Sequence, residues 1–263
     1  MSDQESRSNV VIITGASTGI GRALALSLAE GGSRLALGAR NAALLEETAA
    51  AARQRGGEAL SIPCDVTDPA QVERLVQAAL TTWGKVDVLV SNAGQYLRKP
   101  VLELSIADLE QSMAVNFYGH AHAVLAVLPA MLRQGHGHII LMATMNAKKG
   151  IPPDAPYAAA KFALSGFGDI LRQELRPHGI AVTTIYPGRV DTPMISDLAV
   201  PWISAKITPE ATARAIERAM RTRPAEVILP PQAILLHLVN VFSPRLADWF
   251  VRRLRLEGWK AQN

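Results

Sequence analysis

Short apolar segments alternate with longer amphipathic segments along most of the chain. The short segments are rich in valine, isoleucine and leucine at successive positions rather than at every second position. This pattern is typical of strands that are buried on both faces, as in a parallel sheet. We predict seven such strands, at residues 10–13, 34–39, 59–63, 86–90, 138–143, 180–186 and 226–229.

The segments between these strands have the apolar spacing of amphipathic helices. Ser105 with Asp108 predicts a capping box at the start of the fourth helix, and Thr208 followed by Pro209 predicts the start of the sixth. We expect six helices, at residues 21–30, 42–55, 70–83, 106–133, 157–176 and 210–221.

The alternation of strand and helix predicts an α/β fold. We expect a doubly wound parallel sheet (a Rossmann fold) of about seven strands, with right-handed crossovers and helices on both faces. The sequence has no repeat, low-complexity tract or linker that would mark a second domain. We therefore predict one domain over residues 1–263, with a core at 8–230 and a C-terminal helical extension at 231–263.

Composition narrows the class of protein. A chain of 263 residues that is 49% apolar and 19% charged can bury a large core and is not disordered. A single cysteine, Cys64, excludes an internal disulfide framework, and we expect it to be a buried, inert thiol in a reducing compartment. The first nine residues are polar and carry no apolar signal segment, so we expect a cytoplasmic protein.

The net charge of +4 raises the question of nucleic-acid binding. From Arg245 onward the chain has five basic and two acidic residues, which accounts for three of the four net charges. The main body is therefore nearly neutral and lacks the basic face that a nucleic-acid footprint needs.

Three glycines, Gly15, Gly19 and Gly21, follow the first predicted strand and open the first helix. A helix N-terminus offers unpaired N–H groups and a partial positive charge to a phosphate, and glycine lets the backbone approach it closely. The pattern indicates a dinucleotide site; a tight turn without a ligand is the alternative.

The end of the second predicted strand, Gly38-Ala39-Arg40, distinguishes the two dinucleotides. A carboxylate there would bind the ribose 2′-hydroxyl of NAD, whereas an arginine suits the 2′-phosphate of NADP. This chain has no acid there and an arginine in place, so we expect NADP(H) to be favoured over NAD(H). The alternative is that Arg40 is a solvated residue at the start of a helix.

Tyr157 and Lys161 lie four residues apart and so share one face of the predicted fifth helix. An ordinary tyrosine titrates near pH ~10, and a neighbouring positive charge lowers that pKa toward neutrality. A tunable proton donor of this kind, in a chain with a nucleotide-binding turn, indicates a nicotinamide-dependent redox enzyme.

Together these motifs resemble the short-chain dehydrogenase/reductase family, in its single-domain branch. The resemblance runs from about residue 10 to residue 229 and includes the run from Thr14 to Gly21, Asp65, Asn92-Ala93-Gly94, Asn116, Tyr157 with Lys161, and Pro187-Gly188 with Thr192.

The resemblance implies a role for each matching position. It implies that the turn residues Ser17, Thr18 and Ile20 bind the cofactor with the three glycines. It places Asp65 and Val66 at the adenine end, and Asn92, Ala93 and Gly94 beside the cofactor. It further implies that the nicotinamide lies against Pro187, Gly188, Val190 and Thr192, and that the protein is a homo-oligomer, a dimer or a tetramer.

The resemblance also implies the chemistry. Tyr157 would donate a proton in carbonyl reduction, Lys161 would bind the nicotinamide ribose, and Asn116 would anchor a water linked to the lysine. Thr144 stands thirteen residues before the tyrosine, where the family has a serine that holds the substrate oxygen. A threonine hydroxyl has the same hydrogen-bonding capacity, so we expect Thr144 to replace it.

The substrate is predicted to be an apolar ketone or aldehyde, or the matching alcohol. Residues 193–203, in the family's lid region, are polar at few positions, and we expect Met145, Tyr96 and Leu97 to add to the wall. The alternative is that these side chains pack only against the protein's own tail. A charged group on the substrate stays an open alternative, because three cations lie near this wall in the sequence: Arg98, Lys148 and Lys149.

The C-terminal extension has two parts. Residues 233–242 are almost entirely apolar, Pro244 interrupts them, and residues 246–256 mix aromatic residues with arginines. We expect the extension to cover the protein's own core or a neighbouring subunit; peripheral contact with a membrane is the less favoured alternative.

Two other functions compete with an oxidoreductase. One is a sensor or scaffold that binds the cofactor but has lost or diverted catalysis, which Thr144 alone supports. The other is a non-redox relative, which the full glycine pattern and Lys161 disfavour. We expect no metal site, because the histidines are scattered; they include His120, His122, His136 and His138.

Overall fold

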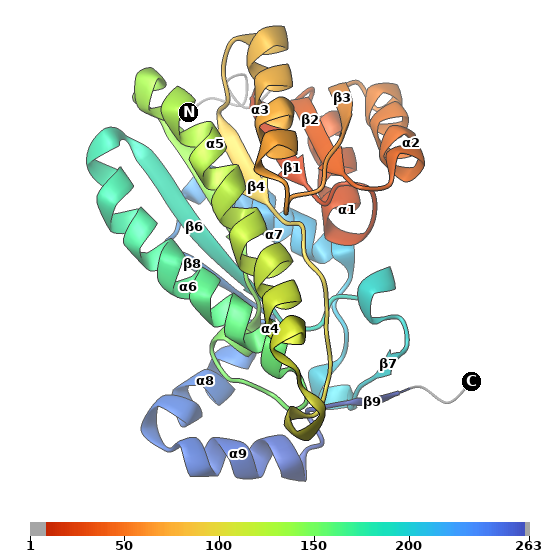
Figure 1. The fold of residues 1–263 in the computed structure, drawn as a ribbon, viewed down its shortest axis with the longest axis vertical. Helices are drawn as coiled ribbons and strands as arrows, with labels where there is room; N and C mark the ends of the chain where they lie inside the picture. Colours follow the sequence, from red (N-terminus) through yellow and green to blue (C-terminus); the bar gives the residue numbers. More distant parts are fainter. Residues whose placement is uncertain (1–8, 261–263) are drawn as a thin grey trace.

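The computed structural model describes residues 9–260 and contains a seven-stranded, fully parallel sheet in the order β3-β2-β1-β4-β5-β6-β8 (Figure 1). This order confirms the predicted doubly wound topology. The strands are β1 Val10–Thr14, β2 Arg34–Ala39, β3 Glu58–Pro63, β4 Val88–Ser91, β5 Gly137–Met142, β6 Ile180–Pro187 and β8 Glu226–Leu229. Each predicted strand is present, with ends displaced by no more than two residues.

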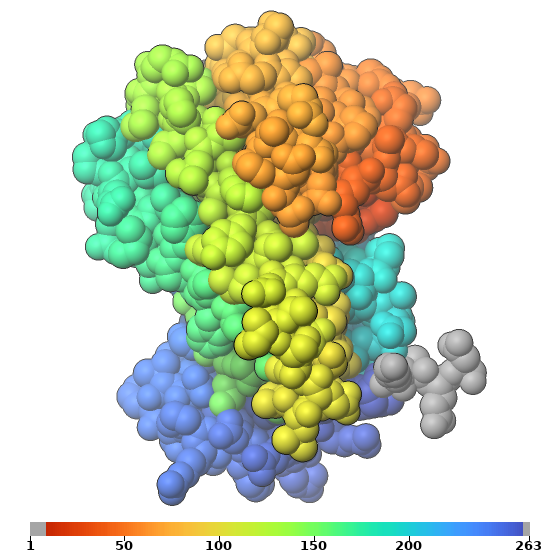
Figure 2. All heavy atoms as spheres, viewed as in Figure 1, coloured from red at the N-terminus to blue at the C-terminus, as the bar shows by residue number. Residues whose placement is uncertain are grey.

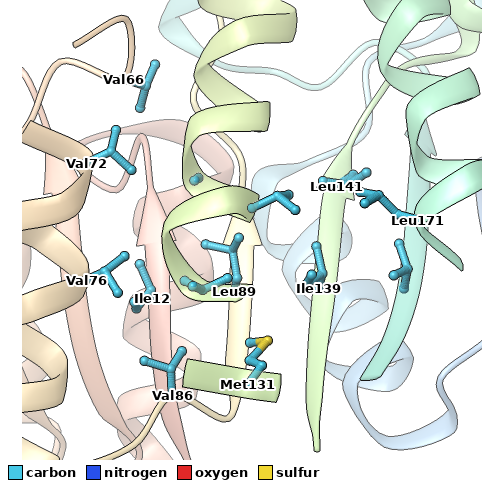
Figure 3. Close-up of a cluster of buried hydrophobic side chains, with 14 of the residues drawn as sticks. Ile12, Val66, Val72, Val76, Val86, Leu89, Met131, Ile139, Leu141 and Leu171 are labelled. Atoms are coloured by element: carbon cyan, nitrogen blue, oxygen red, sulfur yellow. The ribbon is translucent and has the colours of Figure 1, made fainter. Parts of the chain in front are cut away.

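The central strands are buried on both faces, as their unbroken apolar runs predict. In β1, Ile12 belongs to one core cluster, whereas Val11 and Ile13 belong to the other. Figure 3 shows the first cluster, in which Ile12, Leu89 and Ile139 of the sheet face side chains of three helices. Alternate side chains of one strand thus join two separate cores.

Helices cover both faces of the sheet. Helices α3, α5 and α6 contribute residues to the first cluster, and α1, α2 and α7 contribute to the second. These helices are α1 Gly19–Glu30, α2 Ala42–Gln54, α3 Pro69–Trp83, α5 Gly119–Gln134, α6 Ala155–Leu175 and α7 Pro209–Thr222. The capping box of Ser105 and Asp108 is present, and Thr208 accepts a hydrogen bond from the Ala211 N–H.

The predicted helix at 106–133 is not continuous. It consists of α4 Ile106–Met113, a π-helical turn at Ala114–Tyr118, and α5. A π-turn inserts one residue without removing the apolar side of a helix, so the periodicity could not reveal it. The run 106–134 has the length and composition of a membrane span, but 44% of its apolar 18-residue window is buried, and α5 packs on β4, β5 and α3.

The chain beyond β8 forms two helices at one end of the molecule, α8 Ala233–Phe242 and α9 Pro244–Arg253 (Figure 1). Its last described residues pair as β9 Trp259–Lys260 with β7 Leu198–Ala199. Helix α9 buries Ala247 and Val251, whereas α8, which the structure describes completely, buries none of its residues. In Figure 2 the blue atoms of this segment form the lower end of the molecule.

Candidate active site

The carboxyl ends of the central strands converge on one cavity of about 910 Å³. Gly15 follows β1, Asn92 follows β4, Thr144 follows β5, and Pro187 ends β6; all four line the cavity. Ligands of open α/β sheets bind at this edge, beside the point where the strand order reverses. Here that point lies between β1 and β4.

The glycine-rich turn leaves no room for side chains. Gly15 and Gly19 adopt φ values of +68° and +54°, which favour glycine. A Cβ on Gly21 would lie 2.3 Å from the Gly15 carbonyl oxygen. Asn92 Nδ2 donates to the carbonyl oxygens of Thr14 and Gly15, at 3.0 and 3.2 Å, and so fastens the turn to β4.

The first N–H groups of α1 are open to a ligand. The N-cap residue, Thr18, makes no side-chain capping hydrogen bond, and it lines the cavity with Gly19 and Ile20. Uncapped N–H groups at a helix start are where a phosphate binds. A dinucleotide pyrophosphate therefore fits this turn.

A second cavity of about 230 Å³ continues from the first, and Gly15 and Thr18 line both. The predicted adenine-end residues Asp65 and Val66, which follow β3, line this second cavity. Ser17 and the exposed Arg40 line it too. One carboxylate oxygen of Asp65 accepts hydrogen bonds from the N–H and hydroxyl of Thr67, at 3.0 and 2.8 Å.

Tyr157 lies in the first turn of α6 and lines the large cavity with Thr144. Its ring meets that of Tyr96 edge to face, with centroids 5.0 Å apart. Burial raises the pKa of Tyr157 above its usual value and the Asp154 charge adds to the rise, while a hydrogen bond with Thr144 opposes it. The side chains of the chain alone therefore keep Tyr157 protonated.

Lys161 is buried one turn further along α6. Its Nζ donates to the Met142 carbonyl oxygen at 2.8 Å and lies 5.9 Å from the centroid of the Tyr157 ring. Burial lowers the pKa of Lys161 to about 7. Burial thus destabilises the charged form of Lys161. In the protein without cofactor, the lysine therefore does not lower the pKa of Tyr157 as the sequence predicts.

His120 is a site residue that the sequence reasoning missed. It is buried on α5, its Nε2 lies 3.1 Å from Lys161 Nζ, and its Nδ1 lies 2.8 Å from Ser91 Oγ at the end of β4. Burial and the Lys161 charge hold the pKa of His120 well below its usual value. No spacing in the sequence marks it, because His120 and Lys161 lie 41 positions apart in the chain.

Asn116 lies in the π-turn and is fully buried. Its Nδ2 donates to the Gln95 carbonyl oxygen at 2.9 Å, and its Oδ1 accepts from the Gln95 N–H at 3.0 Å. A Cβ on Gly94 would lie 3.1 Å from the same Oδ1. Asn116 therefore holds the loop that follows β4 from behind, and it lines neither cavity.

Asp154 was also missed, and no spacing in the sequence marks it. This carboxylate is buried, and it accepts hydrogen bonds from Tyr96 Oη at 2.7 Å, Asn146 Nδ2 at 2.7 Å and Arg98 Nε at 3.0 Å. The network orients Tyr96 against Tyr157 and forms part of the cavity wall.

The rest of the large cavity is mostly apolar. The predicted lid contributes Met194, Leu198 and Trp202, and α8 and α9 contribute Leu236 and Phe250. Met145 and Tyr96 line the cavity as predicted, whereas Leu97 does not.

The three cations that the sequence left open for a charged substrate group each have an acidic partner, and only Lys149 of the three lines the cavity. Arg98 pairs with Asp154, Lys148 pairs with Glu226 at 2.7 Å, and Lys149 pairs with Asp248 at 2.5 Å. Two further cations line the cavity. Lys206 lies 3.6 Å from Asp191, whereas Arg189 donates to Ser204 Oγ at 2.7 Å and to the Leu256 carbonyl oxygen, and it forms no ion pair among the described residues. The cavity wall is therefore mostly apolar, with one cation, Arg189, that has no acidic partner there.

The structure brings nearly all of the predicted site residues to these two cavities. Gly21 lies behind the turn and, like Asn116, lines neither. The predicted residues that line the large cavity are Gly15, Thr18, Gly19, Ile20, Asn92, Ala93, Gly94, Thr144, Tyr157, Lys161, Pro187, Gly188, Val190 and Thr192.

Residues 9–200 match the short chain dehydrogenase family. The chain belongs to this family. A fatty acyl-CoA reductase from Acinetobacter baylyi is 35% identical over 84% of this chain and 76% of its own length. The ketoacyl reductase HetN from Nostoc is 32% identical over 91% of this chain and 88% of its own.

A solved structure agrees with the sequence relatives. An alcohol dehydrogenase from Thermococcus sibiricus, in complex with 5-hydroxy-NADP, superposes with a TM-score of 0.78 and 31% identity, covering 84% of this chain and 96% of its own. The present chain is thus an NAD(P)-dependent oxidoreductase of the short-chain dehydrogenase family.

Proposed function

We propose that this enzyme is an NADP(H)-dependent carbonyl reductase that acts on long apolar ketones or aldehydes. One observation carries the proposal: a single cavity joins the glycine turn and the hydroxyls of Tyr157 and Thr144 to an apolar wall that extends to α8 and α9. Two relatives, a fatty acyl-CoA reductase and a ketoacyl reductase, have names that agree with such a substrate.

Arg40 supports the preference for NADP(H). It stands at the smaller cavity, where the resemblance places the adenine end, and Ala39 and Asn41 beside it carry no negative charge that would oppose a phosphate. A guanidinium can bind a 2′-phosphate with two charge-assisted hydrogen bonds.

The bound cofactor would supply the hydride to the carbonyl carbon. Tyr157 gives its hydroxyl proton to the carbonyl oxygen, so that the product is the alcohol. Thr144 donates a hydrogen bond to the same oxygen and orients it toward the tyrosine. Lys161, held by Met142 and His120, contributes positive charge near the tyrosine when it is protonated.

The test is NADPH oxidation with apolar carbonyl compounds of increasing chain length, by the wild type and by Tyr157→Phe. We expect the variant to lose about 10²–10⁴-fold in kcat while it still binds NADPH, because general acid catalysis contributes this much. Tyr118→Phe is the matched control, since Tyr118 is exposed and lies outside both cavities.

The outcomes separate the competing functions. Equal activity in Tyr157→Phe and the wild type would overturn the assigned proton donor. Tight NADPH binding without turnover on any carbonyl compound would favour the sensor or scaffold. A preference for short, charged substrates would contradict the apolar assignment.

We also propose that the protein is a homo-oligomer that uses α5 and α6, as family members commonly are oligomeric. Leu125 on α5 and Phe162 and Ile170 on α6 are exposed, although each is apolar. Light scattering of the wild type against Leu125→Asp tests this assignment, and a monomeric wild type would contradict it.

A further inference from the structure

The outward side of α8 is an apolar surface that the described chain leaves uncovered. Leu235, Val241 and Phe242 have exposed fractions of 65%, 62% and 86%, and Ile234 and Leu238 are exposed as well. Large contiguous apolar surface on a water-soluble protein usually marks an interaction site.

Helix α9 continues this surface and adds charge. Leu246 and Trp249 are exposed on it, and so are Arg245, Arg252 and Arg253. The single acidic residue of α8 and α9, Asp248, is already paired with Lys149. We call these exposed residues of α8 and α9 the C-terminal surface; it combines apolar side chains, a tryptophan and three arginines.

The C-terminal surface is the outer side of the cavity wall. Leu236 and Val239 of α8 and Phe250 of α9 line the cavity, one helix thickness from the exposed positions. Leu235 both lines the cavity and is exposed, so it stands at an opening between the cavity and this surface.

We propose that the C-terminal surface docks on an anionic lipid bilayer. An amphipathic helix with apolar and tryptophan side chains on one side and arginines at its edge lies in the interface of such a bilayer. At ten residues, α8 is far too short to cross a membrane, so the contact is peripheral.

A second copy of this chain is a poorer occupant. A two-fold interface places the same surface on both subunits, so six arginines would gather there with two aspartates, each of which is already paired with a lysine. An anionic headgroup layer instead complements the three arginines, each of which contributes about 1 kcal/mol of attraction.

Docking explains why the cavity opens on this side. If the function proposed above holds, an apolar substrate dissolved in the bilayer reaches Tyr157 past Leu235 without crossing water. The docking itself does not depend on that function, so the two can fail separately.

The experiment is co-flotation of the purified full chain with vesicles of phosphatidylcholine, with and without phosphatidylserine. We expect the wild type to bind the mixed vesicles and to be released by high salt. A variant with Leu238→Ser, Val241→Ser and Phe242→Ser should stay in solution. A variant with Arg245→Gln, Arg252→Gln and Arg253→Gln should bind about 100-fold more weakly.

The controls concern folding and the other apolar surface. Leu125→Ser with Ile170→Ser removes exposed apolar side chains from α5 and α6, where the contact between subunits is proposed, and this variant should still bind the mixed vesicles. All variants should bind NADPH as the wild type does, because none of the substituted residues lines either cavity.

Three results would overturn the proposal. The first is that the wild type binds neither kind of vesicle. The second is that the triple serine variant binds as well as the wild type. The third is that the wild type self-associates in solution and the triple serine variant does not. The last would assign the surface to a second copy. Docking without carbonyl reduction would refute the proposed function alone.

Discussion

The two ends of the cavity are built in different ways. At the cofactor end the backbone makes the site: glycines in left-handed conformations pack against β4, and uncapped N–H groups face the cavity. At the substrate end side chains make it, from the lid, α8 and α9, and several of these are exposed. One end tolerates almost no change in shape, whereas the other can change its lining without disturbing the sheet.

This difference teaches where specificity resides. A backbone cradle binds what every dinucleotide shares, the pyrophosphate, and leaves discrimination to an exposed side chain such as Arg40. The substrate end has no such common group to bind. Its selectivity depends on the length and polarity of what the apolar wall admits.

The largest loss of activity is expected where the cofactor end and the substrate end of the cavity meet. Thr144→Ala removes the hydroxyl beside Tyr157, and we expect kcat to fall about 10²–10³-fold, as for loss of one hydrogen-bond donor to a developing oxyanion. Thr144→Ser keeps the hydroxyl and should retain turnover. Steady-state kinetics of both variants check this, and full activity in Thr144→Ala would remove Thr144 from the mechanism.

The next largest effect is expected at the cofactor end, where substitution of Arg40 should change the preference for NADPH over NADH. Arg40→Ala should reduce the preference for NADPH over NADH about 10–100-fold, because a charge-assisted contact to the 2′-phosphate contributes about 1.5–3 kcal/mol. Arg55→Ala is the control, since Arg55 pairs with Glu30 on the surface. Titration of both cofactors measures the ratio; an unchanged ratio would contradict the role of Arg40.

Two glycine substitutions contrast the crowded cradle with an open helix surface. Gly21→Ala places a Cβ 2.3 Å from a backbone oxygen, so the free energy of unfolding should fall by about 1–3 kcal/mol and NADPH should bind more weakly. At Gly166 on α6 a Cβ meets nothing within 4 Å, and alanine should stabilise the helix by about 0.5–1 kcal/mol. Denaturant titrations compare them, and equal effects would refute the contrast.

A pH dependence of stability due to Lys161 is small over any one pH unit and accumulates over several. Its folded pKa of about 7 lies below that of an unfolded lysine, so between these values the unfolded chain binds more protons. This contribution makes the free energy of unfolding rise with pH above 7, by at most about 1.4 kcal/mol per pH unit. The wild type should gain stability relative to Lys161→Met from pH 7 to 10, as measured by urea unfolding; parallel curves would mean that burial does not shift this lysine.

The sequence predicted the cofactor end more fully than the substrate end. Glycine spacing, Asn92 and Arg40 are local signals, since each follows directly from a strand end, and the structure places all of them at one edge of the sheet. Leu97 illustrates the opposite case: it stands next to Tyr96 in the chain but does not line the cavity. Which side of an irregular loop faces the substrate does not follow from a periodic pattern.

By itself, the sequence determined the strand and helix order, the parallel topology, the phosphate turn and the pairing of Tyr157 with Lys161 on one helix face. These features depend on periods and spacings of a few residues. Only the tertiary structure decided the contact of His120 with Lys161, the burial of Asp154 among Tyr96, Arg98 and Asn146, and the exposure of α8. Each of these depends on segments far apart in the chain, and burial, which sets the pKa values here, exists only once those segments pack.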